Sequence, residues 1–290
     1  MSQRRVAKVV TAHRQLEGGG FSVRRPFPTQ GLDMVDPFLM LDEMGPVEYA
    51  PGKAVGAPDH PHRGFETVTY VLKGDVVHED SHGGGGTIGP GDVQWMTAGS
   101  GIVHSEMPSE TLQREGGWMH GFQIWVNLPA SKKMSAPRYQ GLSRDEIPSA
   151  TSEDGLATVR VIAGSALGVD AAIDTHIPIT YQHWSLKGGA SLDQPVPTDH
   201  NAFAYVFDGT AEVGESRRLV TSGQVAFFGP GDVVRIGAAE GSTAEVLLLS
   251  GKPIREPVAR YGPFVMNTRD EIIQAFEDYQ TGKMGNIERS

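Results

Sequence analysis

Short runs of β-branched, aromatic and other apolar residues alternate with glycine- and proline-containing turns along most of the chain. Runs such as 67–72, 93–96 and 118–128 are separated by turns that recur about every eight to twelve residues. The 37 glycines and 19 prolines are consistent with so many turns. The pattern predicts an all-β protein built as a sandwich or barrel.

One segment near the C-terminus has helical periodicity instead. Thr268 and Glu271 form the sequence signature of a capping box, and Gly282 is a stop signal. The apolar residues spaced for one helix face are Ile272, Phe276 and Tyr279. We expect a helix over residues 269–281 whose apolar stripe packs on a β-domain.

The second half of the chain repeats the first. The matching strings are YVLKGDV (70–76) with YVFDGTA (205–211), and IGPGDVQWM (88–96) with FGPGDVVRI (228–236). Turn-and-strand units that recur in the same order indicate a duplicated β-domain. The predicted domains span residues 1–135 and 136–290, and the second ends in the helix.

Two stretches of the first half each carry two metal-capable side chains at positions i and i+2. They are His60 with His62, and His104 with Glu106. A strand places i and i+2 on the same face, so two neighbouring strands could aim all four at one point. Ten histidines in 290 residues give roughly 0.3 His-x-His pairs by chance, so the first pair is informative only beside the second. Three imidazoles and a carboxylate predict a site for a divalent transition metal that leaves room for substrate.

Four other residues have more than one interpretation. Glu66 is a fifth ligand, a carboxylate that orients a ligand imidazole, or a surface strand residue. His78 and His82 lie in an acidic, turn-like stretch, where they could bind metal opportunistically, and are interpreted as solvated. His120 lies in an apolar strand and is interpreted as a core histidine, with a place in the pocket lining as the alternative. The histidines that receive no role are His13, His176, His183 and His200.

The internal repeat serves as a control for the metal site. Counted from the matching strings, none of the candidate ligands recurs in the second half. The residues found instead are Pro195 and Pro197 for the His-x-His pair, Asn201 for Glu66, and Ala244 and Val246 for His104 and Glu106. We therefore expect a metal in the first domain and none in the second.

Composition excludes several classes of function. The net charge of −10 argues against direct binding to a nucleic-acid backbone. Without cysteine, the chain has no disulfide, thiolate nucleophile or cysteine-ligated metal. No apolar run is long enough to span a membrane, and the N-terminus has no signal-peptide core. We expect a soluble cytoplasmic protein.

Several long strings resemble the pirin family of the cupin superfamily. They are HPHRGFETVTYVLKG, GPGDVQWMTAGSGIVHSEMP, HGFQIWVNLP and GPFVMNTRDEIIQAFEDYQTGKMG. The resemblance covers most of the chain and weakens over 140–200. It implies two consecutive cupin domains, which are jelly-roll β-barrels, with one metal in the N-terminal cupin and usually none in the C-terminal one. The ligands it implies are His60, His62, His104 and Glu106, with Glu66 as a supporting or reserve residue.

The resemblance also implies quercetin 2,3-dioxygenase activity, in which a flavonol is cleaved with O₂. The flavonol hydroxyl loses its proton more readily on a Lewis-acidic metal, and Glu106 is the catalytic base that takes it. The residues considered for the apolar walls of the pocket are Trp95, Met96, Phe122 and Trp125, all of which are also typical core residues.

A second hypothesis is a metal- or redox-sensing regulatory protein that acts through protein partners, as some pirins do. The metal is Fe(II) by resemblance, although imidazole and carboxylate suit nickel, cobalt, manganese, copper and zinc as well. Turnover of quercetin under air separates the two hypotheses.

Overall fold

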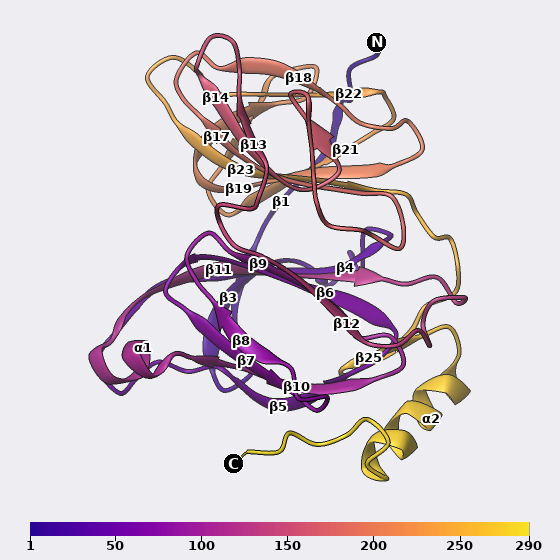
Figure 1. Ribbon diagram of the computed structural model, residues 1–290. Helices are drawn as coiled ribbons and strands as arrows, with labels where there is room; N and C mark the ends of the chain where they lie inside the picture. The colour runs from indigo at the N-terminus through magenta and orange to yellow at the C-terminus, as the bar shows by residue number, and fades with distance from the viewer. Residues whose placement is uncertain (290) are drawn as a thin grey trace. The chain divides into compact units, whose positions relative to one another are not determined.

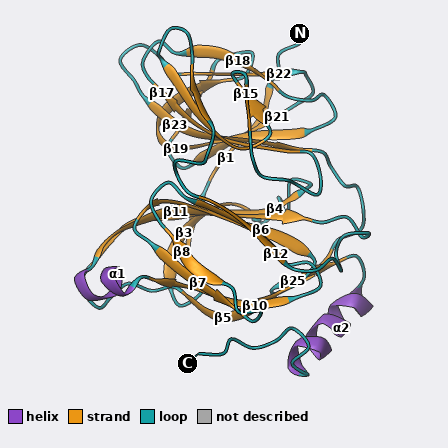
Figure 2. Ribbon diagram, viewed as in Figure 1, coloured by secondary structure: helices purple, strands orange, loops and turns teal. Residues whose placement is uncertain are grey.

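The computed structural model describes residues 1–289 and divides into two compact units. The first unit contains Arg14–Arg144 and the chain from Ile254 onward, and the second contains Met1–His13 and Asp145–Pro253. Strands dominate both units (Figures 1 and 2), which confirms the all-β prediction.

The first unit is built from a seven-stranded and a four-stranded antiparallel sheet. Its strands are β2 (His13–Glu17), β3 (Phe21–Phe27), β4 (Phe38–Tyr49), β5 (Ala57–His62), β6 (Phe65–Lys73), β7 (Val76–Asp80), β8 (Gly85–Ile88), β9 (Val93–Thr97), β10 (Ile102–Pro108), β11 (Gly117–Asn127) and β12 (Arg138–Leu142), with a separate hairpin of β24 (Ala259–Tyr261) and β25 (Phe264–Met266). The larger sheet has the order β12-β9-β6-β11-β4-β3-β2, and the smaller one β5-β10-β7-β8.

The second unit has a ten-stranded sheet and an apolar interior. Its strands are β1 (Val6–Thr11), β13 (Ser149–Thr151), β14 (Ala157–Ala163), β15 (Ser165–Ala166), β16 (Val169–Asp170), β17 (Ile179–Leu186), β18 (Ser191–Pro195), β19 (Asn201–Val213), β20 (Arg218–Thr221), β21 (Gln224–Phe228), β22 (Val233–Gly237) and β23 (Ala244–Gly251). β15 and β16 pair only with each other. Trp184, Val206 and Leu248 are fully buried in its core.

The two units share one strand-pairing scheme. In the first, β6 pairs with β9 and β11, and in the second the first half of β19 pairs with β21 and β23. Likewise β10 pairs with β5 and β7, as β22 pairs with β18 and the second half of β19. The predicted duplication is therefore visible in the hydrogen-bonding pattern.

This scheme corrects one equivalence expected from the repeat. The Gly-Pro-Gly-Asp turn at 89–92 precedes β9, whereas the similar turn at 229–232 precedes β22. By its pairing β22 corresponds to β10, so the positions equivalent to His104 and Glu106 lie on β22 and not at Ala244 and Val246 of β23. The inward-facing residues of β22 belong to the apolar core and include Val234 and Ile236.

The units also divide the chain differently from the expected boundary at residue 135. β12, beyond that boundary, pairs along β9 in the first unit. β1, from the N-terminus, pairs along β21 in the second. Each unit thus receives an edge strand from the other side of the boundary. Such an exchange depends on long-range pairing, which local sequence patterns do not report.

The predicted C-terminal helix is confirmed as α2 (Arg269–Gln280). Its N-cap is Thr268, and both hydrogen bonds of the capping box are present. Figure 1 shows α2 beside β25, and its buried residues pack in one apolar cluster with Val103 of β10. Tyr279, the last residue of the predicted stripe, is instead 39% exposed.

A short helix, α1 (Glu110–Glu115), was not expected from the sequence. It begins at Ser109, whose side chain accepts a hydrogen bond from the backbone of Leu112. Among residues 1–289, no helix combines the length and apolar character that a membrane crossing needs.

A buried lysine fixes the turn between β5 and β6. Gly64 in this turn has a φ of +86°, and a Cβ there would lie 2.0 Å from the carbonyl oxygen of Val265, so glycine is required. Lys133, which is 1% exposed, donates hydrogen bonds from Nζ to the carbonyl oxygens of Gly64 and Val265 and to Oδ1 of Asn127. These three hydrogen bonds, the Lys133 clamp, hold the end of β5, where His62 lies.

Lys133 makes the free energy of unfolding depend on pH in the alkaline range. Burial lowers its pKa to about 8, so above pH 8 the folded state releases a proton that the unfolded state keeps. Stability therefore rises with pH over this window. Relative to Lys133→Met, we expect the free energy of unfolding of the wild type to increase by about 2 kcal/mol between pH 7.5 and 10. Denaturant unfolding of both proteins across this range measures the difference between their free energies of unfolding. A difference that stays constant with pH would contradict the lowered pKa of Lys133.

Candidate metal centre

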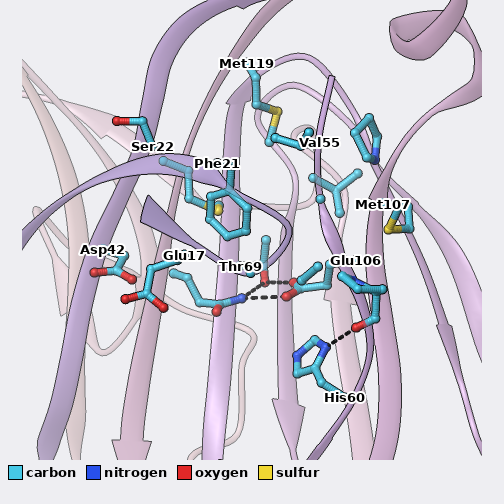
Figure 3. A pocket seen from close by; sticks show the side chains of 18 of the residues that line it. Glu17, Phe21, Ser22, Asp42, Val55, His60, Thr69, Glu106, Met107 and Met119 are labelled. Atoms are coloured by element: carbon cyan, nitrogen blue, oxygen red, sulfur yellow. Dashed lines mark hydrogen bonds between the residues drawn. The ribbon is translucent and has the colours of Figure 1, made fainter. Parts of the chain in front are cut away.

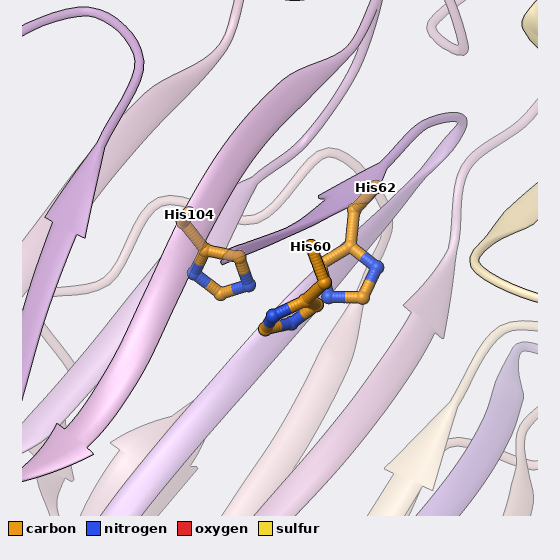
Figure 4. A group of neighbouring side chains, drawn as sticks. All are labelled: His60, His62 and His104. Carbon is orange, nitrogen blue, oxygen red and sulfur yellow. The ribbon is translucent and has the colours of Figure 1, made fainter. Parts of the chain in front are cut away.

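Antiparallel pairing of β5 with β10 brings three histidines together. His104 lies directly opposite His60, and Ile102 lies opposite His62. The ring centroids are 4.7 Å apart for His60 and His62, 4.4 Å for His60 and His104, and 5.0 Å for His62 and His104 (Figure 4). One ligand atom from each ring lies within 4.8 Å of the others. β5 is the edge strand of its sheet, a place where Pro61 is tolerated.

The surroundings leave two of these imidazoles without a partner. Both ring nitrogens of His62 and both of His104 are buried, and none has a described partner at good hydrogen-bond geometry, although the backbone of Pro263 lies near enough to His62 to oppose the lowering of its pKa. An unsatisfied buried polar atom costs about 1–3 kcal/mol, so four in one cluster call for a ligand. His60 donates from Nδ1 to the carbonyl oxygen of Pro58 at 2.7 Å, which leaves its Nε2 available. The three rings fit a divalent transition metal.

Burial keeps the two inner rings uncharged. It lowers the pKa of His62 well below the usual value, and the neighbouring His60 and His104 rings add to the shift. Burial likewise lowers the pKa of His104 to about 4, with His60 and His78 adding to the shift and Glu106 opposing it. At neutral pH both rings are in the unprotonated form that binds metals.

The carboxylate of Glu106 lines the same cavity but does not join the convergent ligand atoms. Its Oε1 accepts a hydrogen bond from Oγ1 of Thr69, and its Oε2 accepts one from Nε2 of Gln123, each at 2.8 Å (Figure 3). Thr69 and Gln123 lie opposite each other on β6 and β11. Glu106 as a fourth ligand remains a prediction.

The charge state of Glu106 is set by the same neighbours. Burial opposes ionisation, but His104, His60 and the two hydrogen-bond donors outweigh it and lower the pKa of Glu106. A carboxylate that is ionised and held by Thr69 and Gln123 can accept a proton from a molecule in the cavity.

His60, His62 and Glu106 line a cavity of about 490 Å³, a size typical of small-molecule sites. Both sheets of the first unit line it. The large apolar residues in its wall are Phe21, Met40, Met44, Val47, Tyr49, Val55, Met107, Leu112, Met119 and Trp125. At another part of the wall the carboxylates of Glu17 and Asp42 lie together (Figure 3), both in ion pairs with Arg25.

The apolar wall differs from the one considered from sequence. Of those four residues only Trp125 lines the cavity, with its ring 5.2 Å from that of His62. Trp95 and Phe122 are buried in the core, and Met96 packs in an apolar cluster with Ile102.

Glu66 faces away from the histidine cluster. Side chains alternate without a bulge along β6 from Glu66 to Tyr70, so Glu66 and Thr69 lie on opposite faces. Glu66 is fully buried and accepts a hydrogen bond from Oγ1 of Thr97 at 2.6 Å. The interpretation of Glu66 as a surface residue is therefore wrong, and its orientation argues against the interpretation as a direct ligand.

The remaining histidines are placed as follows. His78 is 7% exposed and lies on β7 opposite Glu106, so its interpretation as solvated is wrong. Its ring lies 5.3 Å from that of Tyr139 on β12, and nothing in the acidic stretch around His78 signals that contact. His82 is exposed as expected. His120 is buried and bonded to Glu43 at 2.9 Å, which confirms it as a core histidine.

Comparison with known proteins assigns the family. The model of the family described as Pirin matches residues 20–126, and that of the Pirin C-terminal cupin domain matches residues 181–285. The chain belongs to the pirin family. The predicted resemblance and the two cupin domains are thereby confirmed.

Relatives of the pirin family match along the whole chain. A pirin-like protein of Solanum lycopersicum is 45% identical over 288 residues, covering 99% of this chain and 94% of its own. A crystal structure of a quercetin 2,3-dioxygenase from Acinetobacter baumannii has a TM-score of 0.92 and 36% identity, covering 99% of this chain and 100% of its own. A bacterial pirin from Escherichia coli, solved in complex with nickel(II), has a TM-score of 0.67 and 19% identity, covering 85% of this chain and 99% of its own, and shows likeness of fold.

The geometry predicts one metal per chain held through His104. We expect His104→Ala to weaken binding of Fe(II) or Ni(II) by on the order of a hundredfold, because it removes one of the three convergent imidazoles. His82→Ala, an exposed histidine outside the cluster, should bind as the wild type does. Titration calorimetry and metal content after desalting measure both. Full metal content in His104→Ala would exclude this cluster as the site.

Proposed function

We propose that the protein is a metal-dependent dioxygenase that cleaves flavonols such as quercetin with O₂. The observation that carries the proposal is the convergence of three imidazoles, two of them buried, beside a largely apolar cavity of about 490 Å³ whose wall also contains the ionised carboxylate of Glu106. The Acinetobacter baumannii quercetin 2,3-dioxygenase, 36% identical across the chain, supports it.

The donor set supports a position for the metal. We propose His60, His62 and His104 as its ligands, with Glu106 as a fourth when its carboxylate turns toward them. When bound there, a divalent transition metal supplies Lewis acidity toward the hydroxyl oxygen of the flavonol. Fe(II) is the metal we propose, and nickel, cobalt, manganese, copper and zinc suit the same donors.

Glu106 performs the proton step. Its carboxylate takes the proton of the flavonol hydroxyl, while Thr69 and Gln123 keep the carboxylate in place through hydrogen bonds to its two oxygens. The deprotonated flavonol is electron-rich and reacts with O₂, the oxidant. The central ring opens with loss of CO, and both oxygen atoms of O₂ remain in the products, so no further reductant is needed.

The cavity favours an enzyme over a regulatory sensor. A sensor that acts through a protein partner needs no substrate-sized volume beside its metal, whereas a flat polyphenol needs apolar walls such as Phe21, Met40 and Met119. These walls also exclude water from the reacting flavonol.

The first test is turnover. Protein loaded in turn with Fe(II), Ni(II), Mn(II), Co(II) or Cu(II) and mixed with quercetin under air should consume the flavonol and release CO with at least one metal. Loss of the flavonol absorbance and CO detection measure it. His104→Ala should be inactive with every metal because it lacks the site. An absence of turnover with all five metals would refute the dioxygenase.

The second test separates the base role of Glu106 from its role as a ligand. Glu106→Gln cannot take the proton, so we expect kcat for quercetin to fall by about a hundredfold or more while the metal content is retained. Gln123→Leu removes one of the two hydrogen bonds to the carboxylate and should lower kcat by about tenfold. Gln274→Leu, on the exposed side of α2, is the matched control. Loss of metal from Glu106→Gln would show that Glu106 acts mainly as a ligand.

A further inference from the structure

Arg260 lines the cavity and has hydrogen-bonding capacity to spare. It comes from β24 in the C-terminal segment, and its Nη1 donates one hydrogen bond, to the carbonyl oxygen of Leu39 at 3.2 Å. No carboxylate among residues 1–289 lies in an ion pair with it. The neighbouring Arg25, by contrast, is engaged by both Asp42 and Glu17. Because a guanidinium carries five N–H donors, Arg260 is the arginine that can bind a ligand.

Trp125 links Arg260 to the metal centre. The guanidinium lies over the Trp125 ring, 5.0 Å from its centroid, and the His62 ring also contacts Trp125, with the two ring centroids 5.2 Å apart. The guanidinium is therefore at most about 10 Å from the His62 ring. This span suits a rigid aromatic molecule whose near end meets the histidines and whose far end meets Arg260. The cation–π contact holds the guanidinium plane in place.

The charges of the cavity indicate which ligand group Arg260 binds. Arg25 and Arg260 are the only arginines or lysines among the described wall residues, against five acidic ones, Glu17, Asp42, Asp59, Asp75 and Glu106. With the two positive charges of a divalent metal included, the acidic groups still outnumber the positive charges by one. An excess of negative charge disfavours a carboxylated or phosphorylated substrate. The group that fits is an uncharged oxygen, such as a phenolic hydroxyl or carbonyl, to which a guanidinium donates a strong hydrogen bond.

We propose that Arg260 is a specificity-determining residue that donates a hydrogen bond to an oxygen on the part of the substrate remote from the metal. This inference rests on the proposed function and narrows its substrate class to neutral flavonols hydroxylated on their outer rings. The same flavonol without outer-ring oxygens still reaches the histidines but offers Arg260 nothing to bind.

The test compares quercetin with 3-hydroxyflavone, which lacks the outer-ring hydroxyls. Both are titrated into Fe(II)-loaded protein under argon, and Kd is measured by quenching of tryptophan fluorescence. For Arg260→Met we expect Kd for quercetin to rise about tenfold, the effect of one charge-assisted hydrogen bond, and Kd for 3-hydroxyflavone to change less than twofold. Arg260→Lys keeps a donor without the planar contact and should fall between. Arg269→Met, an exposed arginine of α2, is the matched control.

The outcomes are distinct. An equal loss of affinity for both flavonols would show that Arg260 only supports the wall through its contacts with Leu39 and Trp125. Unchanged affinity for both would show that Arg260 does not contact the flavonol. Either result overturns the proposal. Failure of the wild type to bind quercetin overturns it as well. Because O₂ is excluded, a protein that binds quercetin selectively through Arg260 yet does not cleave it under air would refute the dioxygenase and leave this inference standing.

Discussion

The register of β5 against β10 is the constraint on which the site depends. It sets His104 opposite His60 and places the second histidine of β5 on the same face. A shift by one residue would turn every ligand to the other side of its strand. The bulge between His104 and Glu106, the edge position of β5 and the Lys133 clamp at its end all act on this one pairing. The buried imidazole nitrogens that it leaves unsatisfied cost folding energy that a bound metal returns.

The two cupin units share one strand-pairing scheme but differ in the side chains that face inward. In the first unit the strand paired with β5 directs His104 and Glu106 inward, toward a cavity. In the second unit the corresponding strand, β22, directs Val234 and Ile236 into a filled apolar core. The backbone plan is the same, so the difference between a site and a core lies in a few inward-facing side chains.

The sequence predicted what depends on short-range pattern. The His-x-His spacing and the capping box at Thr268 are local, and the structure shows both as expected: the His60 and His62 rings lie together, and both hydrogen bonds of the capping box form. The burial of His78, the exchange of edge strands and the true counterpart of β10 depend on pairing between distant segments. The Gly-Pro-Gly-Asp turn led to a wrong alignment of the two halves because it precedes β9 in the first unit and β22, the counterpart of β10, in the second. Thr69, Gln123 and Arg260 had no motif, and only the folded cavity relates them to the histidines.

The most direct test of the account is anomalous diffraction at the metal edge from crystals grown with Fe(II) and soaked with quercetin under argon. We predict a single strong peak per chain, bounded by His60, His62 and His104, with the flavonol in the adjoining cavity and its hydroxyl end toward that peak. A peak in the second unit, or a flavonol bound outside the cavity, would contradict the central claim that this histidine cluster is a metal centre built to receive an aromatic substrate.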